Sequence, residues 1–282
     1  MQSNARPELG ALVDAGGIKT NYLEAGDAGD PPVLLIHGSG PGVTAWANWR
    51  LTIPALAGAG LRVYAPDMVG FGFTDRPAGV TYSMQGWAEQ LIALLDALDI
   101  EKASLVGNSF GGALAIAVAT QVPERIDKLV LMGAMGVSFP ITAGLDAVWG
   151  YEPSVDNMRR ILDIFAYDRD LITDELAQVR YRASIEEGFQ EAFSSMFPAP
   201  RQRWVEAMAT PEATIRAITH ETLVVHGRDD RVIPLENAFR LVQLIEKAQL
   251  HVFGRCGHWT QIEWAAEFNR LVAAFLTAAP RP

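Results

Sequence analysis

The chain has 282 residues, of which 49% are apolar, 20% charged and 9% aromatic. This apolar share supports a sizeable buried core and excludes long-range disorder. The formal net charge of −10 argues against nucleic acid as a partner, because phosphate contact needs a concentrated basic face. Length and composition therefore indicate a globular protein with one large domain or two small ones.

Cysteine content and hydropathy narrow the class further. The single cysteine, Cys256, excludes an internal disulfide and a multi-cysteine zinc site. No apolar stretch reaches the roughly 18–20 residues needed to span a bilayer, and the N-terminal residues lack the charged-then-apolar order of a signal peptide. We therefore expect a cytoplasmic protein with no membrane contact, no metal and no cofactor.

In chain order, short apolar runs alternate with longer segments of helical spacing, which is the pattern of an α/β protein. After a hairpin that turns at Gly16-Gly17, the expected strands are 19–24, 33–37, 62–65, 103–106, 128–132, 222–226 and 249–253. Several of them are apolar throughout, as strands of a parallel sheet are. Helices are expected at 84–98, 113–121, 234–246 and 265–277.

The alternation stops between about residues 138 and 218. This stretch holds many aromatic side chains and four prolines among helical patterns, without a clear strand. Because the sheet pattern resumes afterwards, we interpret the stretch as an inserted helical lid. The predicted organisation is one core made of residues 1–137 and 216–282, with the lid at 138–215.

The sharpest local motif is Gly107-Asn108-Ser109-Phe110-Gly111-Gly112, which follows an expected strand and precedes an expected helix. A strand-to-helix turn this tight strains the backbone, lifts the Ser109 hydroxyl clear of the sheet and leaves the Phe110 N–H free at a helix N-terminus. A glycine-rich turn without a catalytic role is the alternative. The flanking elements favour Ser109 as a nucleophile.

A serine hydroxyl becomes a nucleophile only when a base removes its proton, and the chain offers five histidines. His37 and His226 each end a buried strand and are expected to be structural. His220 and His251 lack a special context. His258 lies in a loop after the last strand, at the carboxyl edge of the sheet where the base must stand. The pattern therefore favours His258.

The carboxylate that orients the imidazole should follow the strand 222–226, at Asp229 or Asp230. Spacing from the turn glycine favours Asp230, with Asp229 solvated or in a surface ion pair. An attacked carbonyl also needs backbone donors for its oxyanion. One is the Phe110 N–H, and the glycines after the strand 33–37 allow the Ser39 N–H to turn inward as the second.

With these residues in place, the chain resembles the α/β-hydrolase superfamily and, within it, the meta-cleavage-product hydrolases. The resemblance covers nearly the whole chain and rests on segments such as HGSGPGVTAWANWR, APDMVGFGFTDRP, LDIFAYDRDL and FGRCGHWTQIE. It implies an α/β-hydrolase fold with a mostly parallel eight-stranded sheet flanked by helices. It also implies hydrolysis of a carbon–carbon bond in a ring-fission product of catechol, during the degradation of aromatic compounds.

The resemblance further implies substrate-binding residues. Arg180 matches the lid arginine that holds the substrate's carboxylate and 2-oxygen, and Asn108 matches a residue that contacts the dienoate. Asn48 and Trp259 match pocket residues, and the Phe110 ring is a further candidate for the pocket wall. The alternatives are a solvated helix charge for Arg180 and plain core packing for Trp259.

The expected reaction is hydrolysis of the C5–C6 bond of 2-hydroxymuconate semialdehyde to 2-hydroxypenta-2,4-dienoate and formate. Alternatives are the same chemistry on a larger 6-alkyl or 6-aryl substrate, a carboxylesterase with the same three residues, and a non-catalytic ligand-binding protein. The sequence leaves open the width of the C6 pocket and whether serine or water attacks. A homodimer is expected from the resemblance alone.

Overall fold

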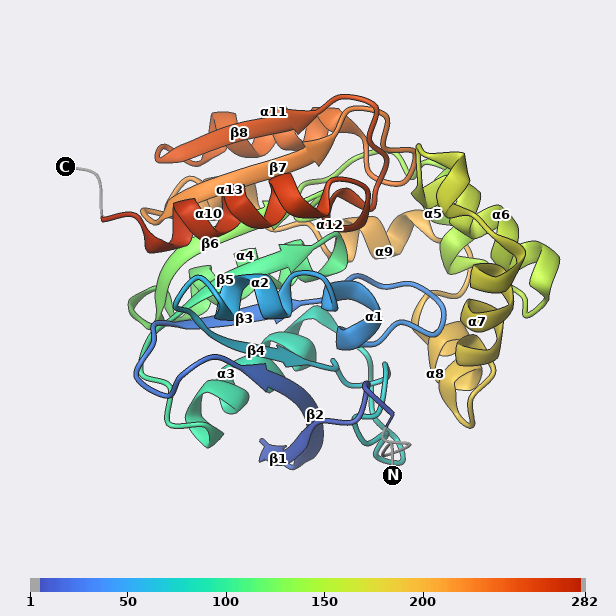
Figure 1. Ribbon diagram of the computed structural model, residues 1–282, viewed down its shortest axis with the longest axis horizontal. Helices are drawn as coiled ribbons and strands as arrows, with labels where there is room; N and C mark the ends of the chain where they lie inside the picture. The colour runs from blue at the N-terminus through green and yellow to red at the C-terminus, as the bar shows by residue number, and fades with distance from the viewer. Residues whose placement is uncertain (1–5, 280–282) are drawn as a thin grey trace.

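The computed structural model describes residues 6–279 and contains an eight-stranded sheet (Figure 1). The strands are β1 (Ala11–Ala15), β2 (Ile18–Ala25), β3 (Pro32–Ile36), β4 (Arg62–Pro66), β5 (Ala103–Asn108), β6 (Ile126–Met132), β7 (Glu221–Gly227) and β8 (Ala248–Phe253). Their order is β1-β2-β4-β3-β5-β6-β7-β8. β2 is antiparallel to β1 and β4, and the remaining pairs are parallel. The predicted mostly parallel eight-stranded sheet is confirmed. Residues 1–5, on which the signal-peptide expectation partly rests, lie outside the described range.

Helices cover both faces of the sheet. Those of the first half are α1 (Ala45–Trp49), α2 (Ile53–Ala57), α3 (Met84–Ala97) and α4 (Phe110–Gln121), and those after β7 are α11 (Leu235–Leu244), α12 (Thr260–Glu263) and α13 (Ala265–Thr277). Hydrophobic periodicity does not predict α1 and α2, because five residues are too few to show a helical period. None of the helices in residues 6–279 is both long enough and apolar enough to cross a membrane.

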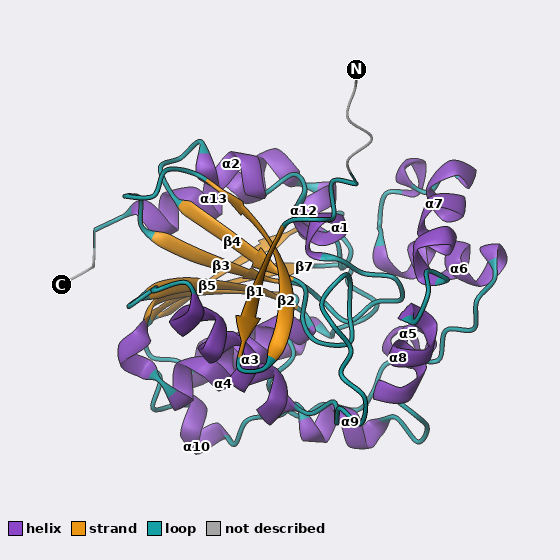
Figure 2. Cartoon of the chain, turned by 90° about the horizontal axis from the view of Figure 1, so that it is seen from below, coloured by secondary structure: helices purple, strands orange, loops and turns teal. Residues whose placement is uncertain are grey.

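Alternate residues of the central strands belong to two separate cores. In β3, Val33 and Leu35 pack with residues of α1, α2 and α13, whereas Leu34 and Ile36 pack with residues of α3, α4 and α11. All four side chains are completely buried. The strand is therefore apolar on both faces, as expected for a parallel sheet covered on both sides. Figure 2 shows α2 and α13 on one side of the strands and α3 and α4 on the other.

The chain between β6 and β7 is helical. It forms α5 (Ala143–Trp149), α6 (Val155–Phe165), α7 (Asp174–Ser184), α8 (Phe189–Met196), α9 (Gln202–Ala207) and α10 (Glu212–Ile215). We call α5 to α10 the helical segment; it falls within the range predicted as a lid. Helix α6 buries Met158, Ile161, Leu162 and Phe165, at the spacing of one helix face. Figure 1 shows α5 to α8 stacked at one end of the sheet, beyond the strands.

A buried lysine closes the C-terminal end of α13. The Lys128 Nζ, on β6, donates hydrogen bonds to the carbonyl oxygens of Phe275, Leu276 and Ala278. The last carbonyls of a helix have no N–H partner within it, and a positive charge there also interacts favourably with the helix dipole. Lys128 therefore anchors α13 to the sheet.

Replacing Lys128 with Met should lower the free energy of unfolding by about 2–4 kcal/mol, because three carbonyl groups lose a charged donor at a buried site. Lys102→Met is the matched control. The Lys102 side chain is 54% exposed, so its loss should change stability by less than about 0.5 kcal/mol. Urea unfolding followed by tryptophan fluorescence measures both variants, and equal stabilities would contradict the anchoring role.

Candidate active site

Ser109 lies at the turn between β5 and α4 in a backbone conformation that residues other than glycine rarely adopt. Its φ is 56° and its ψ −113°. The Ser109 N–H donates to the Met132 carbonyl at 2.9 Å, and its own carbonyl accepts from the Gly112 N–H at 2.9 Å and the Met135 N–H at 3.0 Å. These three hydrogen bonds hold the strained residue in place while its side chain faces a cavity.

The glycines of the motif are required by close backbone approaches. A Cβ on Gly107 would lie 2.2 Å from the Gly111 carbonyl oxygen, and a Cβ on Gly111 would lie 2.2 Å from the Ile36 carbonyl oxygen. Both neighbours are main-chain atoms, which cannot rotate away as a side chain could. The turn therefore needs glycine at these positions for space.

His258 and Asp230 are joined by a short hydrogen bond. The His258 Nδ1 lies 2.7 Å from the Asp230 Oδ2, which leaves Nε2 as the ring nitrogen available to the cavity. The Asp230 Oδ1 accepts from the N–H groups of Val232 at 2.7 Å and Ile233 at 3.0 Å. Burial by itself raises the pKa of Asp230, but the neighbouring imidazoles and these donors outweigh it, and the pKa lies below its usual value. Asp230 is thus a carboxylate that holds the Nδ1 edge of the imidazole.

Two neighbouring residues have other partners. Asp229 forms an ion pair with Arg228 at 3.2 Å near the surface. His226 is completely buried; its Nε2 lies 3.0 Å from the Ile233 carbonyl and 3.5 Å from the Asp230 Oδ2. Burial lowers the pKa of His226. His226 therefore packs behind Asp230 as a neutral ring, away from the cavity.

Phe165, at the end of α6, positions the loop that carries His258. Its carbonyl accepts the His258 N–H at 2.7 Å. Its ring stacks on the His258 ring at a centroid distance of 5.7 Å and on the Trp259 ring at 5.1 Å. A Cβ on Gly257 would lie 2.4 Å from the same carbonyl. The backbone of the helical segment at Phe165 is therefore in direct contact with the backbone of the loop that carries His258.

The two expected oxyanion donors come from the loop after β3 and from the start of α4. The Ser39 N–H, in the loop after β3, has no acceptor within residues 6–279. Phe110 is the first residue of α4, where N–H groups lack an acceptor within the helix. The Ser39 hydroxyl accepts a hydrogen bond from the Trp149 Nε1 of α5 at 3.0 Å, so the helical segment also holds this loop.

The expectation that the Phe110 ring lines the pocket is wrong. The ring is completely buried and packs edge-on against Trp87, with ring centroids 4.8 Å apart, and against Phe71 at 5.7 Å. Phe110 begins a helix that packs against the sheet, and its side chain belongs to the hydrophobic core between the sheet, α3 and α4. Only its backbone remains available to the site.

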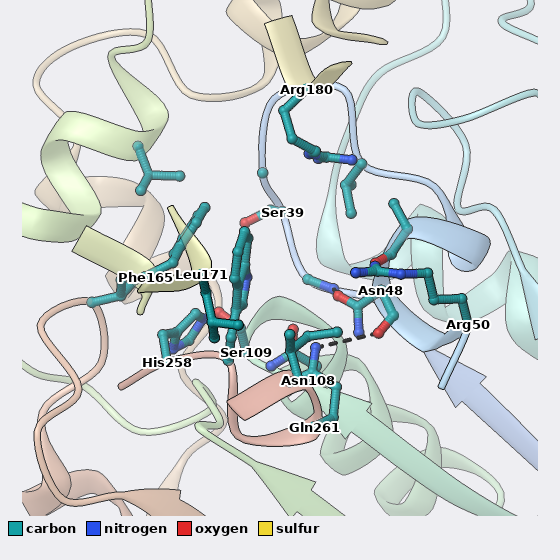
Figure 3. Close-up of a pocket in the computed structure, with 18 of the residues that line it drawn as sticks. Ser39, Asn48, Arg50, Asn108, Ser109, Phe165, Leu171, Arg180, His258 and Gln261 are labelled. Atoms are coloured by element: carbon teal, nitrogen blue, oxygen red, sulfur yellow. Dashed lines mark hydrogen bonds between the residues drawn. The ribbon is translucent and has the colours of Figure 1, made fainter. Parts of the chain in front are cut away.

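A cavity of about 170 Å³ lies over Ser109, between the core and the helical segment (Figure 3). Its polar lining consists of Ser39, Asn48, Arg50, Asn108, Ser109, Arg180, His258 and Gln261. Its apolar lining includes Val43, Leu145, Val148, Phe165, Leu171, Leu176, Val232, Trp259 and Ile262. Figure 3 shows Arg180, Arg50 and Asn48 on one side, with Phe165, Leu171 and His258 on the other. The cavity thus has a cationic side and an apolar side, with Ser109 between them.

Several polar atoms at this cavity have no protein partner. The amide nitrogens of Asn48 and Asn108 and the amide oxygen of Gln261 are buried, without a hydrogen bond to the described residues. An unpaired buried polar group costs about 1–3 kcal/mol, so these atoms need a partner, which ordered water or a ligand can supply. Arg180 donates to the Pro41 carbonyl at 3.2 Å. Burial lowers the pKa of its guanidinium to about 10, which leaves it cationic at neutral pH.

The structure places most of the residues predicted from the sequence at this cavity, together with some that were not predicted. Ser39, Asn48, Asn108, Ser109, Arg180, His258 and Trp259 line it, and Asp230 lies behind His258. Arg50, Gln261 and Phe165 were not expected. The only signal for Arg50 is its place two residues after Asn48. Within residues 6–279 no group of three His, Cys, Asp or Glu side chains could hold a metal ion.

Comparison with known proteins assigns the family. The model of the alpha/beta hydrolase fold family matches residues 31–265. The chain is 63% identical over 276 residues to the 2-hydroxy-6-oxo-2,4-heptadienoate hydrolase of Pseudomonas putida F1, covering 98% of this chain and 99% of that protein. It is 60% identical over 273 residues to the 2-hydroxymuconate semialdehyde hydrolase of Pseudomonas sp. CF600, covering 97% and 95% of the two chains. The chain belongs to the meta-cleavage product hydrolases of the α/β-hydrolase family.

Solved structures agree with this assignment. A serine-to-alanine variant of the meta-cleavage product hydrolase from Pseudomonas fluorescens IP01, complexed with acetates, aligns with a TM-score of 0.94. The sequences are 60% identical, and the alignment covers 96% of this chain and 98% of that one. The present meta-cleavage product hydrolase therefore acts on carbon–carbon bonds in ketonic substances.

Gly107→Ala should lower the free energy of unfolding of this hydrolase by about 3 kcal/mol or more, because the new methyl group meets main-chain atoms of α4. The control is Gly29→Ala, where a Cβ meets nothing within 4 Å; we expect a change below about 0.5 kcal/mol. Thermal and urea unfolding of the two variants give the comparison. A Gly107→Ala protein as stable as the control would disprove the steric account of the turn.

Proposed function

We propose that Ser109, His258 and Asp230 form the catalytic triad of this hydrolase. Ser109 attacks the C6 carbonyl of the substrate, His258 takes the serine proton, and Asp230 holds the imidazole and stabilises its cation. The N–H groups of Ser39 and Phe110 receive the oxyanion. The hydrogen bond of 2.7 Å between His258 and Asp230, beside a cavity that Ser109 also lines, supports these roles.

The carboxylate end of the substrate is proposed to lie at the cationic side of the cavity. Arg180 binds the C1 carboxylate and the 2-oxygen, and the unpaired amides of Asn48 and Asn108 donate to the same oxygens. Trp259 forms part of the wall against which the flat diene packs. The observation that carries this proposal is the division of one cavity into a cationic side and an apolar side with Ser109 between them. We take the helical segment as the lid over it.

The proposed reaction begins with a tautomerisation of the substrate. The C2 hydroxyl proton is transferred in effect to C5, which gives the keto tautomer. Ser109 Oγ adds to C6, and the C5–C6 bond breaks with its electron pair moving into a dienolate whose 2-oxygen faces Arg180. The proton that His258 took from Ser109 is transferred to the dienolate, which leaves as 2-hydroxypenta-2,4-dienoate, and His258 is then free to act as a base again. Water, deprotonated by His258, then releases the acyl group from Ser109 as a carboxylic acid.

We propose that the C6 substituent is small, either hydrogen, as in 2-hydroxymuconate semialdehyde, or methyl, as in 2-hydroxy-6-oxo-2,4-heptadienoate. The cavity of about 170 Å³ lies below the usual range of roughly 300–1,000 Å³ for ligand pockets. Relatives with either substrate in their name are 54% to 63% identical to this chain. One methyl group is worth only about 1–3 kcal/mol of discrimination, so both substrates fit this proposal. The other product is formate or acetate.

Ser109→Ala should reduce kcat for a ring-fission product by at least about 10³-fold, because no oxygen nucleophile remains beside His258. Ser194→Ala, at an exposed position on α8, is the control and should keep full activity. Loss of absorbance of the yellow dienoate measures both. Substantial turnover by the Ser109 variant would refute its role as the nucleophile.

Rapid-quench mass spectrometry of the wild type tests for an acyl group on Ser109 and so separates covalent attack by serine from direct attack by water.

A panel of ring-fission products with hydrogen, methyl, isopropyl and phenyl at C6 tests the proposed size limit. We expect kcat/KM to fall by about 10–100-fold from methyl to isopropyl, and further for phenyl. Leu145→Ala and Val148→Ala, which widen the cavity wall from α5, should reduce this difference. Ile185→Ala, at a surface position outside the cavity, should leave it unchanged. A wild type that prefers the phenyl substrate would overturn the size proposal.

A further inference from the structure

A second arginine reaches the cationic side of the cavity from the core. Arg50 caps the C-terminal end of α1, two residues after Asn48, and its Nη1 donates to the Ala47 carbonyl at 2.8 Å. Its side chain lines the cavity. Figure 3 shows Arg50 extending toward Asn48 from the core while Arg180 extends from α7 into the same space. The two guanidinium groups therefore approach the cavity from opposite layers of the protein.

The two arginines lack an anionic partner. Within residues 6–279, neither Arg50 nor Arg180 has an ion pair with a carboxylate. Burial lowers the pKa of both groups, and the charge of Arg50 lowers that of Arg180 further. Two neighbouring, partly buried positive charges repel each other. Glu8, which lines the space beside them, raises the pKa of Arg180 but forms no ion pair with it and does not outweigh burial and the charge of Arg50. A bound anion would remove this electrostatic cost.

A second hollow meets the cavity at these arginines. It has a volume of about 430 Å³ and shares Ala47, Arg50, Leu176 and Arg180 with the cavity. Its outer wall includes the ion pair of Arg6 with Glu186, whose side chains are 54% and 38% exposed, so the hollow reaches the surface. We call it the vestibule. Arg50 thus stands where the vestibule and the cavity meet.

We propose that Arg50 is a second anion-binding residue, which meets the substrate carboxylate at the vestibule and holds it together with Arg180 in the cavity. The inference rests on the proposed function, because it assumes that the carboxylate lies on the cationic side. It extends that proposal to a residue on the core, so the anion is held between the core and the helical segment. The ligand chemistry is a planar, unsaturated carboxylate.

The test uses binding and turnover in parallel. Sorbate (hexa-2,4-dienoate) has the diene and the carboxylate but no C6 carbonyl, so it binds without reacting. Hexa-2,4-dien-1-ol has the same carbon chain without the charge. Titration calorimetry gives Kd for both compounds with the wild type, Arg50→Met, Arg50→Lys and a control. The control is Arg160→Met, which removes an exposed arginine of α6 that lines neither hollow.

Arg50→Met should raise Kd for sorbate, and KM for the semialdehyde, by about tenfold or more, since a charge-assisted contact is lost. Kd for the neutral dienol should stay within about twofold, which a merely structural role of Arg50 would not produce. Arg50→Lys should restore part of the affinity for sorbate, because it keeps the charge without the planar fork. Arg160→Met should match the wild type.

The outcomes separate the two proposals. Unchanged sorbate binding in Arg50→Met, or equal losses for sorbate and the dienol, would overturn the role of Arg50. A wild type that binds sorbate but cleaves no ring-fission product would overturn the proposed function and leave the anion site standing. A wild type that does not bind sorbate would overturn the anion site itself.

Discussion

The backbone of Ser109 has a positive φ that three hydrogen bonds hold in place, and the close backbone contacts at Gly107 and Gly111 fix the turn around it. Its hydrogen-bond partners lie on β6, in the loop after β6 and in the first turn of α4, while Gly107 and Gly111 allow α4 to approach β5 and β3 closely. A strained residue of this kind persists only when its surroundings over-determine it. The parallel order β3-β5-β6 supplies those surroundings, since it places three strand ends around one turn. The position of the serine hydroxyl is therefore a property of the whole sheet.

The site is completed by contacts that cross from the core to the helical segment. Phe165 binds the backbone of His258, and Trp149 binds the hydroxyl of Ser39. Glu263 of α12 accepts the N–H of Gly257 at 2.7 Å and the N–H of Tyr167 at 2.8 Å, which ties the histidine loop to the chain after α6. Movement of the helical segment would therefore disturb both the proposed base and the proposed oxyanion donor. The helical segment thus holds the loops of His258 and Ser39 in addition to lining the cavity.

Sequence reasoning succeeded where the physical signal is local. The predicted strands agree with the structure to within two residues at either end, because a strand buried on both faces must be apolar throughout. Helix α4 begins at Phe110, three residues before the prediction, since Gly111 and Gly112 are poor helix formers that are used here for close packing. Arg50 could not be predicted, because just after a five-residue helix no periodicity distinguishes a charge that faces a cavity from one that faces water. The ring of Phe110 was misplaced for a related reason, because periodicity does not give the direction of the first residue of a helix.

The net charge of −10 would repel a dienoate if charges acted only at long range. At physiological ionic strength, however, interactions between exposed charges fade over about 8 Å, so most of the acidic surface is screened from the cavity. Partly buried charges are screened much less. Arg50 and Arg180 lie beside the cavity without a carboxylate partner in the described chain, and burial, which weakens the hydration of both groups, also strengthens their attraction for an anion. An acidic protein can thus select an anionic substrate, provided that the partly buried cations beside its cavity have no carboxylate partner.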